Sequence, residues 1–320
     1  KDMPYLDLVN KLTELNNKLI DWDIEEAKTR KKGFVSVVVL VYKNLEMSVR
    51  CIDSLLDSKN NTDYEIIVVN NGPDQNAYIG ICNRYKHKKN IIIINNDQNL
   101  NFALGNNIAV NHASGEKIVF INNDTYVTDN WLDKLVEPLF KNAKKYFASQ
   151  PMLLYADNTI QCLGIGFSEK SPFGLALYSD MSPNNSQIVK NREVQAVTAA
   201  CIAVDINDFI TARGFDPTFI NGQEDIDLCL RLKDLNKNRS AFVVVDSVVY
   251  HDESKSPGRG RYVVENRKEF LKRWKARIIP DIEETFKNDG YKILYWTSDN
   301  LKSAEYNVES MVPYIDTVTH

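Results

Sequence analysis

The sequence lacks any hydrophobic run that approaches the roughly 20 residues of a membrane-spanning helix, and no secretory signal opens it. The sequence begins with Lys1 and not with an initiator methionine, so we expect that it is a piece of a longer protein. The missing targeting signal therefore says little about where the protein is located. The cysteines are odd in number and never paired as CxxC, which favours free thiols in a reducing compartment over a disulfide framework or a zinc site. They are Cys51, Cys82, Cys162, Cys201 and Cys229.

Charge of one sign is not in excess either. Lys and Arg number 39 and Asp and Glu 43, and the resulting net charge of −4 argues against a general nucleic-acid binder. Hydrophobic residues make up 43% of the sequence and charged residues 26%, which is typical of a folded globular chain. With 320 residues, the chain can bury a sizeable core in one large domain or two small ones.

Strands and helices are expected to alternate through the first half of the chain. Leucines recur every three or four residues within 5–30, which predicts an amphipathic helix ended by "RKKG". The β-branched run "VSVVVLVY" at 35–42 then predicts a strand buried on both faces. This alternation predicts a parallel sheet with helices on both faces. Further strands are expected at 64–72, 90–95 and 117–124, with helices at 47–56, 76–86 and 103–113.

After about residue 150 the pattern becomes mixed α/β. No low-complexity linker separates the two halves, so 33–275 is predicted to be one domain, divided into 33–149 and 150–275. A helical extension is expected on each side of this domain, at 1–32 and at 276–320. The expected strands of the second half are 159–167, 193–204 and 241–251, and the expected helices lie near 206–212, 225–235 and 263–277.

Polar residues follow three of the expected parallel strands, at the point where each strand ends. They are Tyr42, Asn70–Asn71 and Asn122–Asp124. Ligands of a parallel sheet bind beyond the carboxyl ends of its strands, so these residues should line one crevice. A carboxylate at such an end suits a divalent cation, because hard cations prefer oxygen ligands. The alternative is a turn in which Asn122 and Asp124 cap the backbone.

Acidic residues cluster after a glycine in "NGQEDIDLCLRL" at 221–232. The helix dipole favours acidic residues in a first turn, and Asp227 could pair with Arg231 four residues further on. That structural pairing accounts for Asp227, but it accounts less well for the adjacent Glu224 and Asp225. Because these two carboxylates would face different directions, one could accept a proton while the other orients a hydroxyl.

A histidine ends the strand expected at 241–251, and the basic loop "SKSPGRGR" follows it. The cations of this loop, Arg259 among them, could close over phosphate groups, and its two glycines would give it mobility. The alternatives are a structural role for His251 and a solvated surface loop.

Together these stretches resemble the family 2 glycosyltransferases of the GT-A fold, over roughly residues 33 to 275. The resemblance implies an α/β fold with a Rossmann-like, mostly parallel sheet flanked by helices. It makes 33–149 the nucleotide-sugar half and the mixed 150–275 the acceptor half. The segments that carry it are "VSVVVLVYKNLEMSVRCIDSLL", "YEIIVVNNGPDQ", "NLNFALGNNIAVNHASGEKIVFINNDTYVTDNWLDKLV", "RGFDPTFINGQEDIDLCLRL" and the strand-end His251.

The resemblance also implies roles for single residues of the donor site. Val41 and Tyr42 stand where the family contacts the nucleotide base, and Asn70 stands where it usually has an aspartate facing base or ribose. Asn122–Asn123–Asp124 matches the "DxD" element, whose last carboxylate meets ribose or metal. The predicted nucleotide-sugar contacts are Val41, Tyr42, Asn70, Asn71, Asn106, Asn123, Asp124 and Arg259.

On the acceptor side, Glu224 and Asp225 match the "ED" motif and are the predicted catalytic residues, with Asp225 as the usual general base. Gly214–Phe215–Asp216 matches the turn before the acceptor site, and His251 matches a histidine that completes the metal site in many members. The sequence departs from the family at Lys43, often asparagine, and at Asn70 and Asn122, often carboxylates. The predicted metal ligands are therefore Asp124, His251 and the donor's diphosphate oxygens. An imidazole ligand favours Mn²⁺ over Mg²⁺.

The implied activity is metal-dependent, inverting transfer of a sugar from a nucleotide-diphosphate sugar to a hydroxyl of a saccharide or lipid-linked saccharide. The implied setting is bacterial surface polysaccharide synthesis in the cytoplasm. If the protein is peripherally associated with the membrane, it would lie at the inner face. Further domains are expected in a longer native chain, and no nucleic-acid partner is expected. A nucleotidyltransferase is a rival, but "LVYKNLEM" has no glycine to hold a triphosphate. A non-catalytic nucleotide-sugar-binding or interaction module on a GT-A scaffold is the other alternative.

Overall fold

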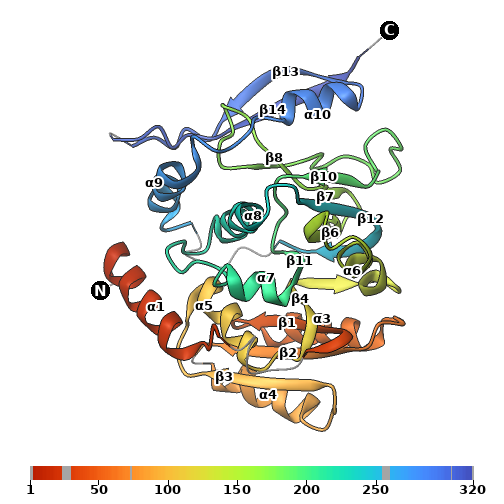
Figure 1. Ribbon diagram of the computed structural model, residues 1–320, viewed down its shortest axis with the longest axis vertical. Coiled ribbons are helices and arrows are strands. Elements are labelled where there is room, and N and C mark those ends of the chain that lie inside the picture. Colours follow the sequence, from red (N-terminus) through yellow and green to blue (C-terminus); the bar gives the residue numbers. More distant parts are fainter. Residues whose placement is uncertain (1–2, 24–29, 73, 254–259, 304, 319–320) are drawn as a thin grey trace.

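The computed structural model of the chain describes residues 3–23, 30–72, 74–253, 260–303 and 305–318. One large sheet with the strand order β10-β12-β6-β11-β4-β1-β2-β3 runs through the molecule. Figure 1 places β3 at one end of the molecule and the C-terminal hairpin at the other. The α/β prediction is confirmed.

The first half of the chain forms the parallel part of this sheet. Strand β1 pairs in parallel with β2 and β4, and β2 pairs in parallel with β3. Val35, Val37, Val38, Val39 and Val41 of β1 are fully buried, as expected of a β-branched strand covered on both faces. The strands are β1 (Lys31–Val41), β2 (Tyr64–Asn71), β3 (Ile91–Asn96) and β4 (Gly115–Asn122); the connecting elements are α3 (Leu45–Asp57), α4 (Gln75–Tyr85), α5 (Asn101–Asn107) and η1 (Ile108–Asn111).

The second half adds mixed pairing, as predicted. β11 (Cys201–Asp205) runs antiparallel to β4 and to β6 (Tyr146–Leu154), and β12 (Ser240–His251) runs parallel to β6. Short strands β5 (Thr125–Val127), β7 (Ile160–Cys162) and β10 (Arg192–Val194) pair with β12 or β6, and β8 (Ile165–Gly166) pairs with β9 (Leu175–Ala176). The helices of this half are α6 (Trp131–Lys141), α7 (Ile206–Thr211), α8 (Glu224–Leu235) and α9 (Val263–Trp274).

The predicted N-terminal helix is present as α1 (Tyr5–Leu19) and lies beside α5 in both figures. Asn16 anchors it there, because its Oδ1 accepts a hydrogen bond of 2.9 Å from Nδ2 of Asn107. Gly214 must be glycine at this contact, since its φ is +65° and a Cβ would lie 2.4 Å from Oδ1 of Asn107. None of the helices in the described ranges combines the length and apolarity that crossing a membrane requires.

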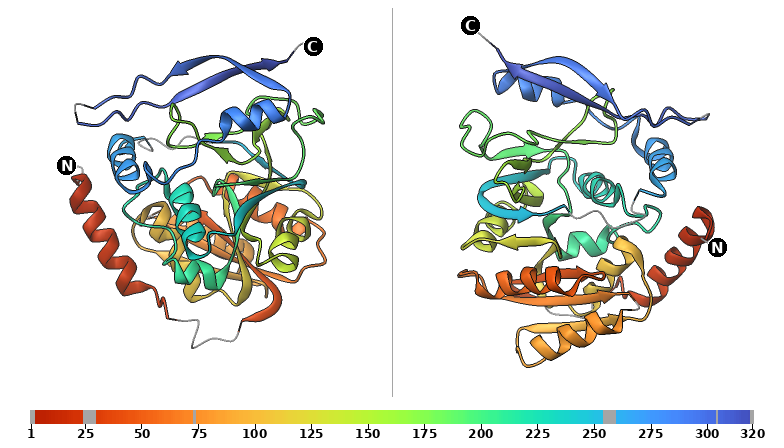
Figure 2. Two further views of the ribbon diagram at one scale, coloured as in Figure 1. Left: turned by 45° about the horizontal axis from the view of Figure 1, so that its top comes forward. Right: turned by 180° about the vertical axis from the view of Figure 1, so that it is seen from behind.

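The helical extension predicted at 276–320 is wrong in its secondary structure. One short helix, α10 (Ile282–Asn288), is followed by the antiparallel pair β13 (Tyr291–Ser298) and β14 (Met311–Thr317). Both strands are rich in the β-branched and aromatic residues that favour strands, and Tyr295 stacks on Tyr314 with ring centroids 4.8 Å apart. Figure 2 shows this hairpin crossing one end of the molecule. The predicted boundaries near residues 33 and 275 stay a prediction.

Candidate active site

The neighbouring parallel strands β4, β1 and β2 have their carboxyl ends at the same end of the sheet. In the ladder Val41 is opposite Asn70, and Leu40 is opposite Asn122. The segments that follow these strands, with Tyr42, Gly72 and Asp124, therefore lie side by side, which is the convergence that the sequence pattern predicts.

Tyr42 directly follows β1 and is half-buried. Its ring lies against the backbone at Gly72, where a Cβ would come within 3.2 Å of Cδ2 of the tyrosine, so a side chain at 72 would displace the ring. Lys43 then turns the chain with a φ of +56°, a conformation that asparagine adopts more readily than lysine. The side chain of Val41 is fully buried, so any contact between this residue and a nucleotide would have to use its backbone.

The side-chain amide of Asn71 is buried and hydrogen-bonded to other residues of the protein. Its Nδ2 donates to the carbonyl of Asn101 at 3.0 Å and to Oδ1 of Asn99 at 3.3 Å. Its Oδ1 accepts from the backbone N–H of Leu100 at 3.1 Å and from Nδ2 of Asn96 at 3.3 Å. The side chain thus holds the loop between β3 and α5, and its role as a donor contact stays a prediction.

Asn70 and Asn106, two further predicted amides of this half, are also buried. Nδ2 of Asn70 donates to Oδ1 of Asn95 at 2.8 Å and to the carbonyl of Gly72 at 3.2 Å. Asn106 lies within α5, where its Nδ2 donates to the carbonyl of Phe102 at 3.0 Å. The bonds of Asn70 support the loops around the site, whereas that of Asn106 stays within α5, and none of them tests a contact with the nucleotide.

Asn122, Asn123 and Asp124 lead from β4 into β5 and point in different directions. The carbonyl of Asn122 accepts from Oγ1 of Thr125 at 2.7 Å, which is turn chemistry. Nδ2 of Asn123 donates to Oγ of Ser48 in α3 at 2.8 Å. Asp124 instead faces His251 at the end of β12, with Oδ1 3.1 Å from Nε2. Asn122 therefore has the turn contact, and Asp124 is the residue whose side chain faces His251.

His251 is held on its other side by Gln161 of β7, a residue that the sequence pattern did not single out. Nδ1 of His251 lies 2.6 Å from Oε1 of Gln161, whose Nε2 donates to the carbonyl of His251 at 3.4 Å. Nε2 of His251 also lies 3.4 Å from Nδ2 of Asn122. The one sequence signal for Gln161 was a polar residue inside the apolar run "TIQCLGIGF".

These residues fit a divalent cation as a partial ligand set. Asp124 and His251 are 6% and 5% exposed and present a carboxylate oxygen and an imidazole nitrogen to each other, and both atom types bind Mn²⁺. Among the residues that the structure describes, no group of three or more His, Cys, Asp and Glu could hold a metal ion. A cation bound here would therefore need further oxygens, and the diphosphate of a bound nucleotide has them.

A second cluster of side chains contacts Tyr250 and Asp252, the residues on either side of His251. Arg50 of α3 forms an ion pair with Asp252, whose backbone N–H donates to the carbonyl of Asp124 at 3.0 Å. The same arginine lies over the ring of Tyr126, 4.8 Å from its centroid, and that ring stacks on Tyr250 at 4.7 Å. The end of β12 is thus tied to both α3 and β5. The predicted phosphate contact Arg259 lies outside the described residues.

The predicted catalytic pair lies at the start of α8. Oδ2 of Asp225 accepts from the backbone N–H of Ala199 at 3.0 Å, and its Oδ1 accepts from the N–H of Ile226 at 2.9 Å. The carbonyl of Ala200, one residue on, accepts from the N–H of Asn122 at 3.0 Å. Through this short segment, Asp225 is connected to the end of β4, two residues before Asp124.

Glu224 points into the protein and behaves differently. It is 4% exposed, and its Oε1 is buried without a hydrogen-bond partner. Burial raises the pKa of its carboxyl from 4.5 to about 8, and the charge of the neighbouring Asp225 acts in the same direction. Near neutral pH, Glu224 therefore holds a proton.

Asp227 has the structural role that was weighed for it. It is fully buried, and its oxygens lie 2.7 Å from Nε of Arg231, 2.9 Å from a guanidinium nitrogen of Arg273 and 2.9 Å from Nε1 of Trp274. These contacts join α8 to α9. A buried carboxylate with three charged or polar donors needs no ligand to explain it.

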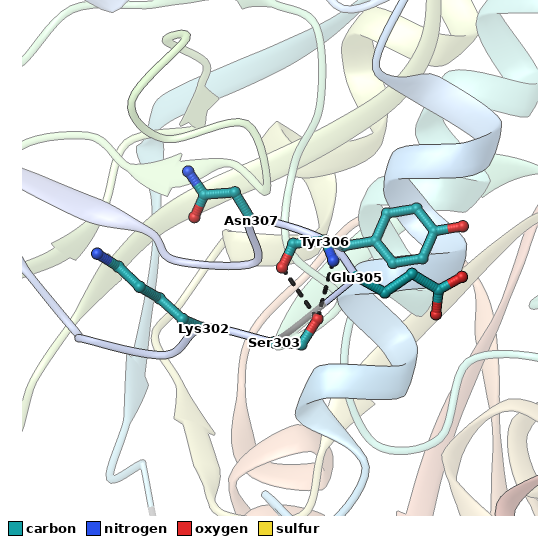
Figure 3. Close-up of a pocket in the computed structure, with 5 residues that line it drawn as sticks. All are labelled: Lys302, Ser303, Glu305, Tyr306 and Asn307. Atoms are coloured by element: carbon teal, nitrogen blue, oxygen red, sulfur yellow. Dashed lines mark hydrogen bonds between the residues drawn. The ribbon is translucent and has the colours of Figure 1, made fainter.

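A small pocket in the C-terminal part of the chain lies apart from these residues (Figure 3). Two of its lining residues are hydrogen-bonded to each other, since Oγ of Ser303 donates to the carbonyl of Tyr306 at 2.9 Å and accepts from its N–H at 3.0 Å. Its other lining residues are Lys302, Glu305 and Asn307. None of the predicted site residues that the structure describes lines it.

Comparison with known proteins agrees with this arrangement. The chain superposes on the structure of GalNAc-T7 with UDP, GalNAc and Mn²⁺ with a TM-score of 0.53, at 16% identity over 80% of this chain and 54% of that one. It superposes on residues 1–349 of S. aureus TarS in complex with UDP-GlcNAc with a TM-score of 0.51, at 17% identity over 73% and 64% of the two chains. At these identities the likeness shows the fold, which is that of the GT-A glycosyltransferases.

The sequence comparisons agree with the resemblance. Residues 36–161 match the model of "Glycosyl transferase family 2", which confirms the resemblance over that part of the chain. It is 28% identical over 204 residues to the O-antigen biosynthesis protein RfbC of Myxococcus xanthus, and 32% identical over 96 residues to a poly(ribitol-phosphate) beta-glucosyltransferase of Bacillus spizizenii. These matches cover 62% and 29% of this chain, but only 16% and 15% of those much longer proteins.

Proposed function

We propose that the chain transfers a sugar, with inversion, from a nucleoside diphosphate sugar to a hydroxyl of a saccharide or lipid-linked saccharide, assisted by a divalent cation. The observation that carries this proposal is the buried Asp124–His251 pair at the carboxyl edge of the parallel strands, 3.1 Å apart and connected through residues 199–200 to Asp225. The proposed metal ligands lie just after β4 and at the end of β12, and the proposed proton acceptor lies at the start of α8, hydrogen-bonded to the segment that leads into β11.

On the donor side, the half-buried ring of Tyr42 at the end of β1 offers a surface for a nucleotide base. Asp124 and His251 would hold the cation from one side, while the diphosphate oxygens complete its ligands. When bound, a divalent cation would stabilise the negative charge that develops on the departing diphosphate. Mn²⁺ suits the mixed oxygen and nitrogen set better than Mg²⁺.

On the acceptor side, Asp225 takes the proton of the attacking hydroxyl. The acceptor oxygen forms a bond to the anomeric carbon as the bond from that carbon to the diphosphate oxygen breaks on the opposite face, so the configuration inverts. The backbone N–H groups of Ala199 and Ile226 fix the orientation of the carboxylate. A protonated Glu224 adds no like charge beside it, and we assign Glu224 to positioning the acceptor.

We also propose a setting for the reaction. The relatives named for O-antigen biosynthesis and for poly(ribitol-phosphate) glucosylation support an acceptor in bacterial surface polysaccharide synthesis. All five cysteines are free, which suits the reducing cytoplasm, and we place the reaction there. We also propose 33–149 as the nucleotide-sugar half and 150–275 as the acceptor half of the transferase domain.

The proposal is tested by incubating the chain with Mn²⁺, a saccharide acceptor and UDP-, GDP- or dTDP-sugars in turn, and measuring the free nucleoside diphosphate. UDP-sugars come first, since the GalNAc-T7 and TarS structures hold UDP or UDP-GlcNAc. We expect release that requires both metal and acceptor, and a product of inverted anomeric configuration by NMR. Binding without any transfer would instead favour a non-catalytic nucleotide-sugar-binding module, and retention of configuration would contradict the mechanism.

A further inference from the structure

Gln161 is a buried polar residue that the proposed mechanism does not use. It lies on β7, is 8% exposed, and directs both ends of its side-chain amide at the same residue. Its Nε2 donates to the carbonyl of His251 at 3.4 Å, and its Oε1 lies 2.6 Å from Nδ1 of the same histidine. The two contacts fix each other, because a backbone carbonyl can only accept and must therefore face the amide nitrogen.

This orientation decides where the imidazole carries its proton. An amide oxygen only accepts, so the short contact requires a hydrogen on Nδ1 of His251. In the neutral ring, Nε2 is then the atom with the lone pair. That atom faces Oδ1 of Asp124 at 3.1 Å and Nδ2 of Asn122 at 3.4 Å, and the second is a donor suited to a lone pair.

We propose that Gln161 is a positioning residue that holds His251 as the Nδ1–H tautomer and so presents Nε2, beside Asp124, to a divalent cation. The part that concerns the cation rests on the proposed function, whereas the tautomer does not. A hydrogen bond to the second nitrogen of a metal-binding histidine fixes the ring and raises its basicity, and its loss typically costs about 10- to 100-fold in metal affinity. If Gln161 had only the structural role of tying β7 to β12, its loss would lower stability without altering the tautomer.

Two substitutions separate these roles. Gln161→Met keeps the length of the side chain but offers no acceptor to Nδ1. Gln161→Glu keeps the acceptor oxygen, so it should preserve the tautomer. Gln150→Met is a matched control, since Gln150 is also fully buried and its Nε2 donates to a backbone carbonyl, that of Cys162, at 3.2 Å, but it does not contact His251.

The experiment uses the full chain labelled with ¹⁵N-histidine, with His251 assigned by its loss in His251→Gln. Long-range ¹H–¹⁵N spectra at pH 9, above the ordinary histidine pKa of about 6.5, report which nitrogen of the neutral ring is protonated. Calorimetry with MnCl₂, in the presence and absence of UDP, reports metal affinity. We expect the Nδ1–H tautomer in the wild type, in Gln161→Glu and in Gln150→Met. In Gln161→Met we expect mixed tautomers and about 10- to 100-fold weaker Mn²⁺ binding.

An Nε2–H tautomer in the wild-type protein overturns the proposal, even if Gln161→Met does not fold. Unchanged tautomer and Mn²⁺ affinity in Gln161→Met also overturn it. If the wild type binds no Mn²⁺ but shows the Nδ1–H tautomer, and Gln161→Met loses that tautomer, the failure lies in the proposed metal-assisted function. The assignment of Gln161 as the residue that sets the tautomer is then supported.

Discussion

Replacing Asp225 by asparagine should remove the proton acceptor while leaving the donor site intact. General-base catalysis contributes about 10²- to 10⁴-fold, which corresponds to about 2.7–5.5 kcal/mol of activation free energy. The loss should appear in kcat, with the affinity for UDP and Mn²⁺ nearly unchanged, because Asp225 lies on α8 and the proposed metal ligands lie at the ends of β4 and β12. Steady-state transfer assays and calorimetry with UDP measure the two effects separately.

The structure also predicts what this substitution costs in stability. Each oxygen of Asp225 accepts one backbone N–H, from Ala199 or from Ile226, and asparagine has a single acceptor oxygen. One N–H therefore loses its partner, which costs about 1–3 kcal/mol if that group stays buried. Thermal or urea unfolding should register this loss while the variant remains folded.

The matched control is Asp227→Asn, two positions along the same helix. It breaks the ion pairs with Arg231 and Arg273, so its main effect should be on stability, with kcat close to that of the wild type wherever the variant is folded. Transfer by Asp225→Asn within a few-fold of the wild-type rate would show that Asp225 is not the general base.

Three further predictions follow from particular contacts. In Glu224→Gln, the free energy of unfolding should fall less steeply with pH between 4.5 and 8 than in the wild type. In this range the folded wild-type protein keeps a proton on Glu224 that the unfolded chain releases, so rising pH favours unfolding. Urea titrations across the range measure the difference. Gly105→Ala should lower stability by about 1–3 kcal/mol in the same assay, because a Cβ would lie 2.8 Å from Nδ2 of Asn71 and 2.9 Å from Cδ1 of Leu40. Asn71→Ala should also be destabilising, by about 1–3 kcal/mol, since it leaves the buried N–H of Leu100 without its acceptor, and a variant as stable as the wild type would contradict the structural role.

The parallel half of the fold could be predicted from the sequence because its strands are continuous apolar runs. Residues 35–42, 64–72 and 117–124 are buried on both faces, so local composition alone marks them. Once the strands are parallel, topology brings their ends together, and the convergence of Tyr42 and Asp124 follows without knowledge of any side-chain contact.

Other elements could not be predicted because their burial depends on distant partners. Strand β6 contains Ser149, Gln150 and Pro151, which break the apolar pattern. Ser149 is nevertheless fully buried, because its Oγ donates to the carbonyl of Leu135 in α6 at 2.6 Å. The exposed hairpin of β13 and β14 was missed for the opposite reason, since neither strand is buried enough to leave a strong hydrophobic pattern.

The candidate site, too, could be predicted only in part from the sequence. The positions of Asp124, Asp225 and His251 at element ends were visible in the sequence, whereas Gln161 and Arg50 act through contacts with residues 90 and 202 positions away. By its position, Asn71 was a plausible contact for the nucleotide. Only the structure of the loop shows that its amide nitrogen already donates two hydrogen bonds and its amide oxygen already accepts two. Long-range pairing of polar groups leaves no periodic signal in a sequence.

Asp124 and His251 are proposed to bind a nucleoside diphosphate through a shared cation, and calorimetry with UDP is the decisive test. Titrations would be run with Mn²⁺ and with EDTA on the wild type, on Asp124→Asn and His251→Ala, and on Asp252→Asn as a control beside the pair. We expect UDP to bind the wild type and the control at least tenfold more tightly with Mn²⁺ than with EDTA, and we expect both ligand variants to lose this difference. UDP affinity that is the same with and without Mn²⁺, or a metal effect that survives in both ligand variants, would contradict it.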